Sequence, residues 1–196
     1  MTQAKTIKDR ITTNGENNLY VVSDFADLKN DCVVTRTLSR LAEEGLLVRL
    51  AQGIYLYPSR NRFGIQRPSI DTIAEVVAQK SQAQIIPSGL TALNVLGLST
   101  QVTMNAVYIT NGYPRTINVG NRKILFKKGS PKYFSFKSRR FAMIVLAMKE
   151  IGEKAMTQDL LDKILVLVAQ EPAKTYDADI LIAPQWIRRI LKAKTA

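Results

Sequence analysis

A change of apolar period within residues 31–58 constrains the fold of this 196-residue chain more than any other feature. Three apolar residues follow the i, i+4, i+7 spacing of a helix that buries one face: Val34, Leu38 and Leu41. Gly45 is expected to end the helix, because glycine adopts the left-handed conformation of a helix end at little cost. Two β-prone runs follow at residues 46–50 and 54–57. A helix followed directly by a small hairpin is typical of a winged helix-turn-helix.

The preceding residues predict the remainder of the same small domain. Two isoleucines one helical turn apart indicate a helix over residues 3–14. A β-prone run follows at residues 19–22, and Ser23 is expected to cap a short second helix at residues 24–28. Together with the helix and hairpin described above, these elements fill a winged-helix domain of residues 1–58.

The polar residues 59–68 are interpreted as a linker to a second domain at residues 69–196. Helices of this domain are expected at residues 69–79, 88–96, 138–150, 157–169 and 184–192, the second of them capped by Ser88. Strands are expected at residues 84–86, 107–110, 115–119 and 122–126. The expected fold class is therefore α+β, with an N-terminal winged helix-turn-helix followed by a mixed α/β C-terminal domain.

Basic residues are concentrated in the middle of the chain. The net charge is +12, and residues 61–140 alone carry 12 Lys or Arg and 2 Asp or Glu. No Asp or Glu occurs between Val76 and Lys149. Charge of this sign attracts polyanions or an acidic protein surface. The sequence therefore predicts a nucleic acid or an acidic protein as a partner.

The exposed arc of the helix at residues 31–43 carries side chains that can hydrogen-bond nucleic acid. Its amino-terminal half is expected to enter a major groove, so three residues are candidates for reading bases: Thr35, Arg36 and Ser39. Three others are candidates for contacting phosphates: Arg40, Arg49 and Gln52. The alternative interpretation is a solvated polar surface on a winged helix used for protein contact.

A second group of cations lies on and after the strands expected at residues 115–126. Its members are candidates for contacting phosphates or a partner protein: Arg115, Arg122, Lys123, Lys127, Lys128 and Lys132. Tyr133, Phe134 and Phe136 lie beside them in sequence, which raises the possibility of base stacking. The simpler interpretation places these rings in the core and leaves one basic side of the strands in water.

The residue inventory argues against catalysis and metal binding. The chain has no histidine and a single cysteine, Cys32, so histidine-based catalytic sites and thiolate or histidine zinc sites are not expected. No glycine-rich nucleotide-binding motif occurs. The pairs Asp159/Asp162 and Asp177/Asp179 are interpreted as helix-start or solvated acids. We expect a protein that is not an enzyme and takes no cofactor or metal.

The same inventory gives an expectation about location. No apolar run reaches the about 18–20 residues that cross a bilayer. The first residues are polar and unlike a signal peptide. One cysteine cannot form an internal disulfide, which fits a reducing compartment. We expect a cytoplasmic protein without membrane contact.

Two sets of residues resemble those of AbiEi-like antitoxins, the regulator half of type IV toxin–antitoxin pairs. The first set is Leu38-Ser39-Arg40-Leu41, Gly45, Leu47-Val48-Arg49, Gly53-Ile54-Tyr55 and Pro58. The second set is Ile86-Pro87-Ser88-Gly89-Leu90-Thr91-Ala92-Leu93-Asn94, Gly97-Leu98-Ser99-Thr100-Gln101, Val107-Tyr108-Ile109-Thr110-Asn111-Gly112, Arg115-Thr116 and Pro184-Gln185-Trp186-Ile187. The resemblance covers about residues 20–190. Gln52 departs from it, since relatives often carry a basic residue at the wing tip.

The resemblance implies an antitoxin of an abortive-infection phage-defence system. Such a protein binds inverted repeats in double-stranded promoter DNA, represses its own promoter, and counters a nucleotidyltransferase toxin, directly or indirectly, through its C-terminal domain. The cations of residues 115–132 would then contact phosphate or the toxin. Two alternatives stay open. One is a plain winged-helix transcription factor with a ligand-sensing or oligomerising C-terminal domain and no toxin partner, and the other is an interaction module of a larger defence complex.

Overall fold

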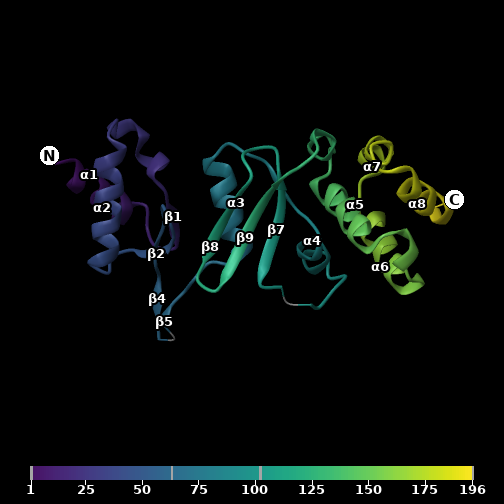
Figure 1. Ribbon diagram of the computed structural model, residues 1–196, viewed down its shortest axis with the longest axis horizontal. Coiled ribbons are helices and arrows are strands. Elements are labelled where there is room, and N and C mark those ends of the chain that lie inside the picture. Colours follow the sequence, from purple (N-terminus) through teal and green to yellow (C-terminus); the bar gives the residue numbers. More distant parts are fainter. Residues whose placement is uncertain (1, 63, 102, 196) are drawn as a thin grey trace. The chain divides into compact units, whose positions relative to one another are not determined.

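The computed structural model of the chain describes residues 2–62, 64–101 and 103–195. Helices and strands are both abundant, so the mixed α+β class is confirmed (Figure 1). The described residues form two compact units. The first contains the residues up to Gln82 together with Ile117–Ile124, and the second contains Ala83–Thr116 and the residues from Leu125 onwards. Within the described residues, no helix is long and apolar enough to cross a membrane.

The first unit begins with helices arranged around a small sheet. Its elements are α1 (Gln3–Thr13), β1 (Asn18–Tyr20), the 3₁₀ helix η1 (Val22–Leu28), α2 (Asp31–Glu43), β2 (Val48–Ala51) and β3 (Ile54–Tyr57). The strands are antiparallel in the order β1-β3-β2, and Leu56 of β3 lies opposite Leu19 on one side and Val48 on the other. The core contains the apolar residues expected from the helical spacing: Ile7, Ile11, Phe25, Val34, Leu38 and Leu41.

Local capping explains where α2 begins and ends. The Asn30 side chain accepts a hydrogen bond from the Val33 N–H at 3.2 Å, and Gly45 follows the helix with φ of 77°. The prediction that Ser23 caps the preceding helix is wrong. η1 begins after Val21, and the Asp24 carboxylate accepts the Val21 N–H at 2.9 Å. Ser23 is the second residue inside η1, so it lies past the position from which a side chain can cap the helix.

The expected linker contains more structure than a plain connector. It folds into a two-stranded hairpin, β4 (Arg60–Asn61) with β5 (Gly64–Ile65). Helix α3 (Ile70–Lys80) follows, and the Ser69 hydroxyl caps it by accepting the Thr72 N–H at 3.0 Å. The first compact unit includes α3, so this division differs from a boundary at residues 59–68. The expected domains of residues 1–58 and 69–196 stay a prediction.

The second unit contains most of a four-stranded sheet. Its strands are β6 (Ile85–Pro87), β7 (Asn105–Thr110), β8 (Arg115–Val119) and β9 (Arg122–Lys128), in the order β6-β7-β9-β8. β6 pairs antiparallel with β7, which places Ile86 opposite Ile109. The predicted hairpin around Gly120 and Asn121 is confirmed.

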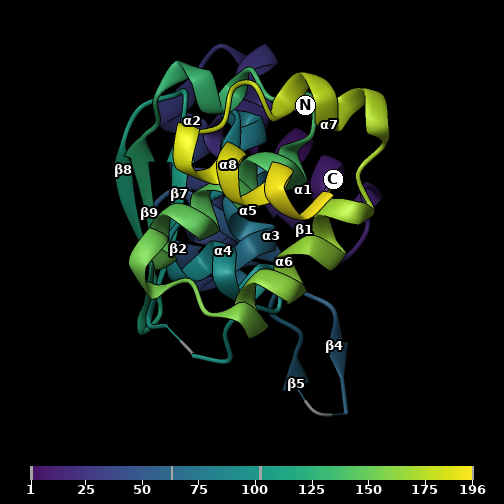
Figure 2. The ribbon, with the colours of Figure 1, turned by 90° about the vertical axis from the view of Figure 1, so that its right-hand side faces the viewer.

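Helices complete the second unit (Figure 2). They are α4 (Leu90–Val95), η2 (Pro131–Phe134), α5 (Arg139–Ile151), η3 (Glu153–Ala155), α6 (Gln158–Ala169), α7 (Ala173–Asp179) and α8 (Gln185–Thr195). Helix α5 is the most deeply buried of them, with Phe141, Ile144 and Val145 fully shielded from solvent. The Ser138 and Thr157 hydroxyls cap α5 and α6.

Three expectations for this unit are corrected. Ser88 does not cap α4, because the capping position is Gly89, at φ of 61°, without a side-chain bond. Helix α7 was not expected, since its residues lack a clear apolar period. Asp179 is not a solvated acid. It is fully buried, and its two oxygens accept the N–H groups of Lys137 and Ser138, each at 2.8 Å.

Candidate nucleic-acid interface

Helix α2 presents a polar surface opposite the apolar face that it buries. Val34, Leu38 and Leu41 are buried, whereas Thr35 and Arg36 are exposed. Within the part of the chain that the structure describes, Arg36 makes no hydrogen bond or ion pair. Its guanidinium therefore keeps all its donors for an external partner such as a guanine edge or a phosphate.

Arg40 lies one turn beyond Arg36 and is also exposed. It forms an ion pair with Glu44, one turn further on, at 3.4 Å. The Arg40 side chain is 58 % exposed and the Glu44 side chain 50 % exposed. Ion pairs of this kind contribute little free energy in water. Arg40 can therefore exchange Glu44 for a phosphate at small cost, as a backbone-contacting residue requires.

The structure gives Ser39 a different environment from the other candidates. Its side chain is half-buried, and its hydroxyl lies 3.0 Å from the hydroxyl of Tyr55 on β3. Tyr55 itself is 1 % exposed. This hydrogen bond joins α2 to the hairpin, so Ser39 positions the helix rather than presenting a free hydroxyl. Sequence reasoning missed Tyr55, because the two residues are 16 apart in the chain.

The β2–β3 hairpin places the two remaining candidates of the first unit. Arg49 on β2 and Gln52 in the turn are both exposed. Arg49 lies directly opposite Tyr55 in the pairing of β2 with β3. Tyr55 is also the residue whose hydroxyl bonds Ser39 of α2. Gln52 is neutral, so it can donate a hydrogen bond to a phosphate but adds no charge.

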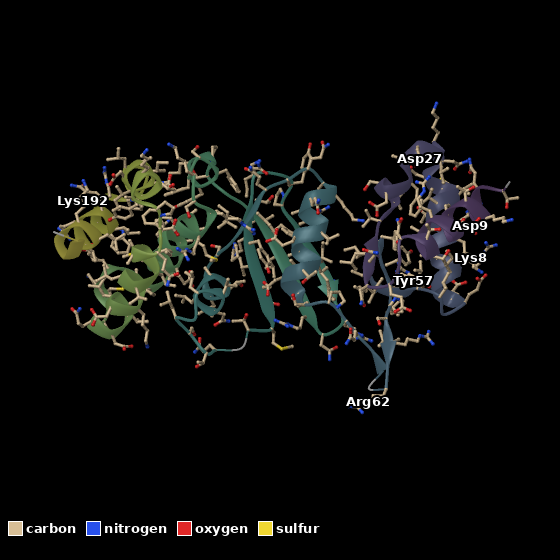
Figure 3. The ribbon with its side chains drawn as sticks, turned by 180° about the vertical axis from the view of Figure 1, so that it is seen from behind. Lys8, Asp9, Asp27, Tyr57, Arg62 and Lys192 are labelled. Atoms are coloured by element: carbon tan, nitrogen blue, oxygen red, sulfur yellow. The ribbon has the colours of Figure 1, made fainter. Side chains whose placement is uncertain are left out.

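The β4–β5 hairpin carries two arginines, Arg60 and Arg62. Arg60 donates to the backbone oxygen of Gly45 at 2.9 Å, which ties this hairpin to the turn after α2. Arg62 is exposed and lies at the tip of the hairpin (Figure 3). Arg60 therefore has a structural role, because it joins this hairpin to the end of α2.

A separate cluster of ion pairs and hydrogen bonds around Arg10 and Lys80 joins elements of the first unit. Arg10 donates to both carboxylate oxygens of Asp27, at 2.8 and 2.7 Å, and this hydrogen bond raises the pKa of Arg10 and lowers the pKa of Asp27. Lys80 donates to the backbone oxygen of Leu19 at 2.7 Å and pairs with Asp24. Burial raises the pKa of the neighbouring Tyr20 phenol. These cations also line a cavity of about 430 Å³, but both already have carboxylate partners.

The second group of candidate cations lies on β8, β9 and η2, and several of its members contact other groups of the protein. All six are exposed: Arg115, Arg122, Lys123, Lys127, Lys128 and Lys132. Lys128 donates to the backbone oxygen of Asn111 at 3.0 Å. The guanidinium of Arg115 lies 5.5 Å from the ring of Phe126, and the amine of Lys132 lies 5.3 Å from the ring of Tyr133. Lys123 and Lys127 alternate with the buried Ile124 and Phe126, so they share the other side of β9.

The aromatic residues beside these cations support the simpler of the two interpretations. Tyr133 is 6 % exposed, and Phe134 and Phe136 are half-buried against the core of the second unit. Tyr133 and Phe136 stack on each other with ring centroids 6.4 Å apart. These rings are therefore packing residues and do not form a base-stacking surface.

The described residues hold no group of three or more Cys, Asp or Glu side chains placed to bind a metal ion. The candidate surfaces therefore consist of cations, hydroxyls and amides, which is the chemistry that contacts phosphate and base edges. Cys32 is exposed near the start of α2.

Comparison with known proteins gives a family for the chain. One family model matches residues 6–176, which is most of its length. The chain belongs to the DUF6088 family, a family of unknown function. No curated protein matches this DUF6088 member. Both candidate surfaces lie within the matched residues.

Proposed function

We propose that this DUF6088 protein is a DNA-binding regulator whose first unit contains a winged helix-turn-helix. The element order α1, β1, η1, α2, β2, β3 and the sheet order β1-β3-β2 support this assignment. In this fold α2 is the helix that enters the major groove and the β2–β3 hairpin is the wing. The observation that carries the proposal is Arg36, exposed on α2 and without an internal partner among the described residues.

The proposed contacts assign each side chain a role on the duplex. Thr35 and Arg36 read base edges, because they lie on the amino-terminal half of α2 and are exposed. Arg40, Arg49 and Gln52 contact phosphates and fix the orientation of the helix. Ser39 acts indirectly by holding α2 against Tyr55.

We further propose that the protein is an AbiEi-like antitoxin that represses its own promoter and counters a nucleotidyltransferase toxin. The motifs in residues 38–58 and 86–112 support this proposal. The long interval without Asp or Glu, from Val76 to Lys149, also supports it, since it suits a polyanion or an acidic partner. The toxin would be encoded beside this gene.

Co-expression tests the antitoxin proposal. The adjacent gene is induced alone, with the wild-type protein, and with Arg36→Ala. The proposal expects growth arrest by the adjacent gene alone and rescue by both forms of this protein, because neutralisation is assigned to the second domain. An adjacent gene that is harmless, or arrest that the wild type does not relieve, would favour the second candidate function. That candidate is a winged-helix transcription factor without a toxin, and it rests on the exposed surface of α2 alone.

Removing charge from β9 should change the salt dependence of DNA binding but leave sequence preference intact. Lys123→Gln combined with Lys127→Gln removes two exposed cations that share one side of the strand. If both contact phosphates, the slope of log affinity against log salt should fall in magnitude by about 1.8, or about 0.9 per phosphate. Binding is measured by fluorescence anisotropy over a salt series.

The control is Lys154→Gln combined with Lys174→Gln, which removes the same charge from two exposed positions outside β9. This variant should keep the wild-type slope. A matching loss of slope in both double variants would mean that β9 acts only through the net charge of the protein.

A further inference from the structure

The loop between β7 and β8 carries an aromatic side chain, Tyr113, that is almost fully exposed to solvent. Tyr113 is 92 % exposed, the largest value among the exposed large apolar residues of the described chain. An aromatic side chain left in water forgoes the free energy that burial of its ring would contribute. The rest of the second unit instead packs its rings, including Tyr133, Phe136 and Phe141. Tyr113 is therefore an exception among the aromatic residues of this unit.

The base of this loop is held by a dense set of hydrogen bonds. The Asn111 side chain accepts the Gln84 N–H at 2.8 Å, and the Asn111 N–H donates to the Gln84 backbone oxygen at 3.3 Å. The Thr110 hydroxyl accepts the Gly112 N–H at 3.0 Å. Lys128 donates to the backbone oxygen of Asn111 at 3.0 Å. The backbone immediately before Tyr113 is therefore fixed by bonds from three different segments.

Packing also restrains the backbone at Gly112, the residue before Tyr113. A Cβ atom at Gly112 would lie 2.8 Å from the Cβ of Ala83, closer than real contacts allow. Only glycine fits there without a shift, and Pro114 restricts the backbone on the other side of Tyr113. The ring thus projects from a rigid support. A ring held in this way loses little conformational entropy on binding, which favours contact with a partner.

The charge around the loop indicates what kind of partner this is. Arg115 follows Tyr113 by two residues and is exposed, and Lys128 lies at the loop base with its amine bonded to loop carbonyls. No acidic residue occurs in the sequence between Val76 and Lys149. An exposed ring beside cations matches the two parts of a nucleotide, a flat base and a phosphate. An acidic protein surface would use the cations but has no equivalent need for the ring.

We propose that Tyr113 is a stacking site for an unpaired base of a single-stranded nucleic acid, with Arg115 contacting an adjacent phosphate. Duplex DNA buries its bases in the stack, so a protruding ring gains most from a strand whose bases are free. This inference concerns the second unit and does not depend on the DNA-reading role of α2. It also differs from stacking on Tyr133, Phe134 and Phe136, which the structure packs inside.

The test is fluorescence anisotropy with the full-length protein and a short labelled DNA strand of mixed sequence. Tyr113→Ser should weaken binding about 5- to 150-fold, the range for loss of one base–aromatic stack. Tyr113→Phe keeps the ring and should bind like the wild type. Leu181→Ser removes a different exposed apolar side chain, 63 % exposed, and should have no effect. Circular dichroism of each variant checks that the fold is retained.

Four further measurements make the result specific: the duplex, the Arg36→Ala variant, an RNA strand and a polyglutamate peptide. The duplex of the same sequence should be affected less by Tyr113→Ser than the single strand, and Arg36→Ala should weaken promoter-duplex binding but leave single-strand binding unchanged. An RNA strand should show the same dependence on Tyr113. The proposal is overturned if Tyr113→Ser binds the single strand as tightly as wild type, if Tyr113→Phe is as weak as Tyr113→Ser, or if a polyglutamate peptide shows the same loss.

Discussion

Arg36→Ala is expected to weaken binding to the promoter of the protein's own gene by about 1–3 kcal/mol and to relax base preference at one position. Its guanidinium is exposed on α2 and makes no internal bond within the described residues, so the loss reflects the missing DNA contact rather than a damaged fold. A bidentate arginine contact to guanine accounts for an effect of this size. A mobility-shift titration with the upstream DNA measures the affinity, and a set of point-substituted duplexes measures the preference.

Lys8→Ala is the matched control, because it removes one exposed cation from α1 of the same unit (Figure 3). It should leave both affinity and preference near wild type. Equal weakening by Lys8→Ala and Arg36→Ala would show that only the net charge of the first unit matters. Wild-type affinity in Arg36→Ala would remove the main support for base reading by α2.

Asp179→Ala should lower the free energy of unfolding by about 2–4 kcal/mol. The carboxylate is fully buried and accepts the N–H groups of Lys137 and Ser138, at the start of α5. Removing it leaves two donors without their acceptor and takes a negative charge away from the positive end of that helix. Because α5 is the centre of the second unit's core, the effect is expected to be global. Urea denaturation followed by circular dichroism measures it.

The neighbouring carboxylate provides the comparison. Asp177 lies on the same helix, α7, but is exposed. Asp177→Ala should change the unfolding free energy by no more than about 0.5 kcal/mol. Similar losses in both variants, or no loss in Asp179→Ala, would mean that the two backbone hydrogen bonds to Asp179 do not hold the start of α5.

The elements that could be predicted from the sequence are those specified by neighbouring residues. Helix α2 follows from apolar spacing, and α6 lies close to the residues expected for it. Ser69, Ser138 and Thr157 each accept a backbone N–H three residues further on, so residues next to the helix start specify these caps. The Gly120–Asn121 hairpin follows from turn chemistry in the same way. Each of these features depends on residues within a few positions of one another, so one sequence is sufficient.

The features that the sequence did not predict depend on partners far along the chain. The burial of Asp179 depends on contacts with residues 41 and 42 positions away. The bond from Ser39 to Tyr55 changes a predicted base-reading residue into one that positions α2. The rigidity of the loop before Tyr113 depends on Ala83, Gln84 and Lys128. Periodicity and composition contain no information about such contacts.

The most direct test of the central claim is to map the DNA-contacting residues by NMR, following backbone amide shifts as promoter duplex is added. The account predicts the largest shifts at Thr35, Arg36 and Arg40 on α2 and at Gln52 in the wing turn, with small shifts at Lys5 and Lys8 on the exposed side of α1. Unchanged amides across α2, with shifts confined to the second unit, would contradict it.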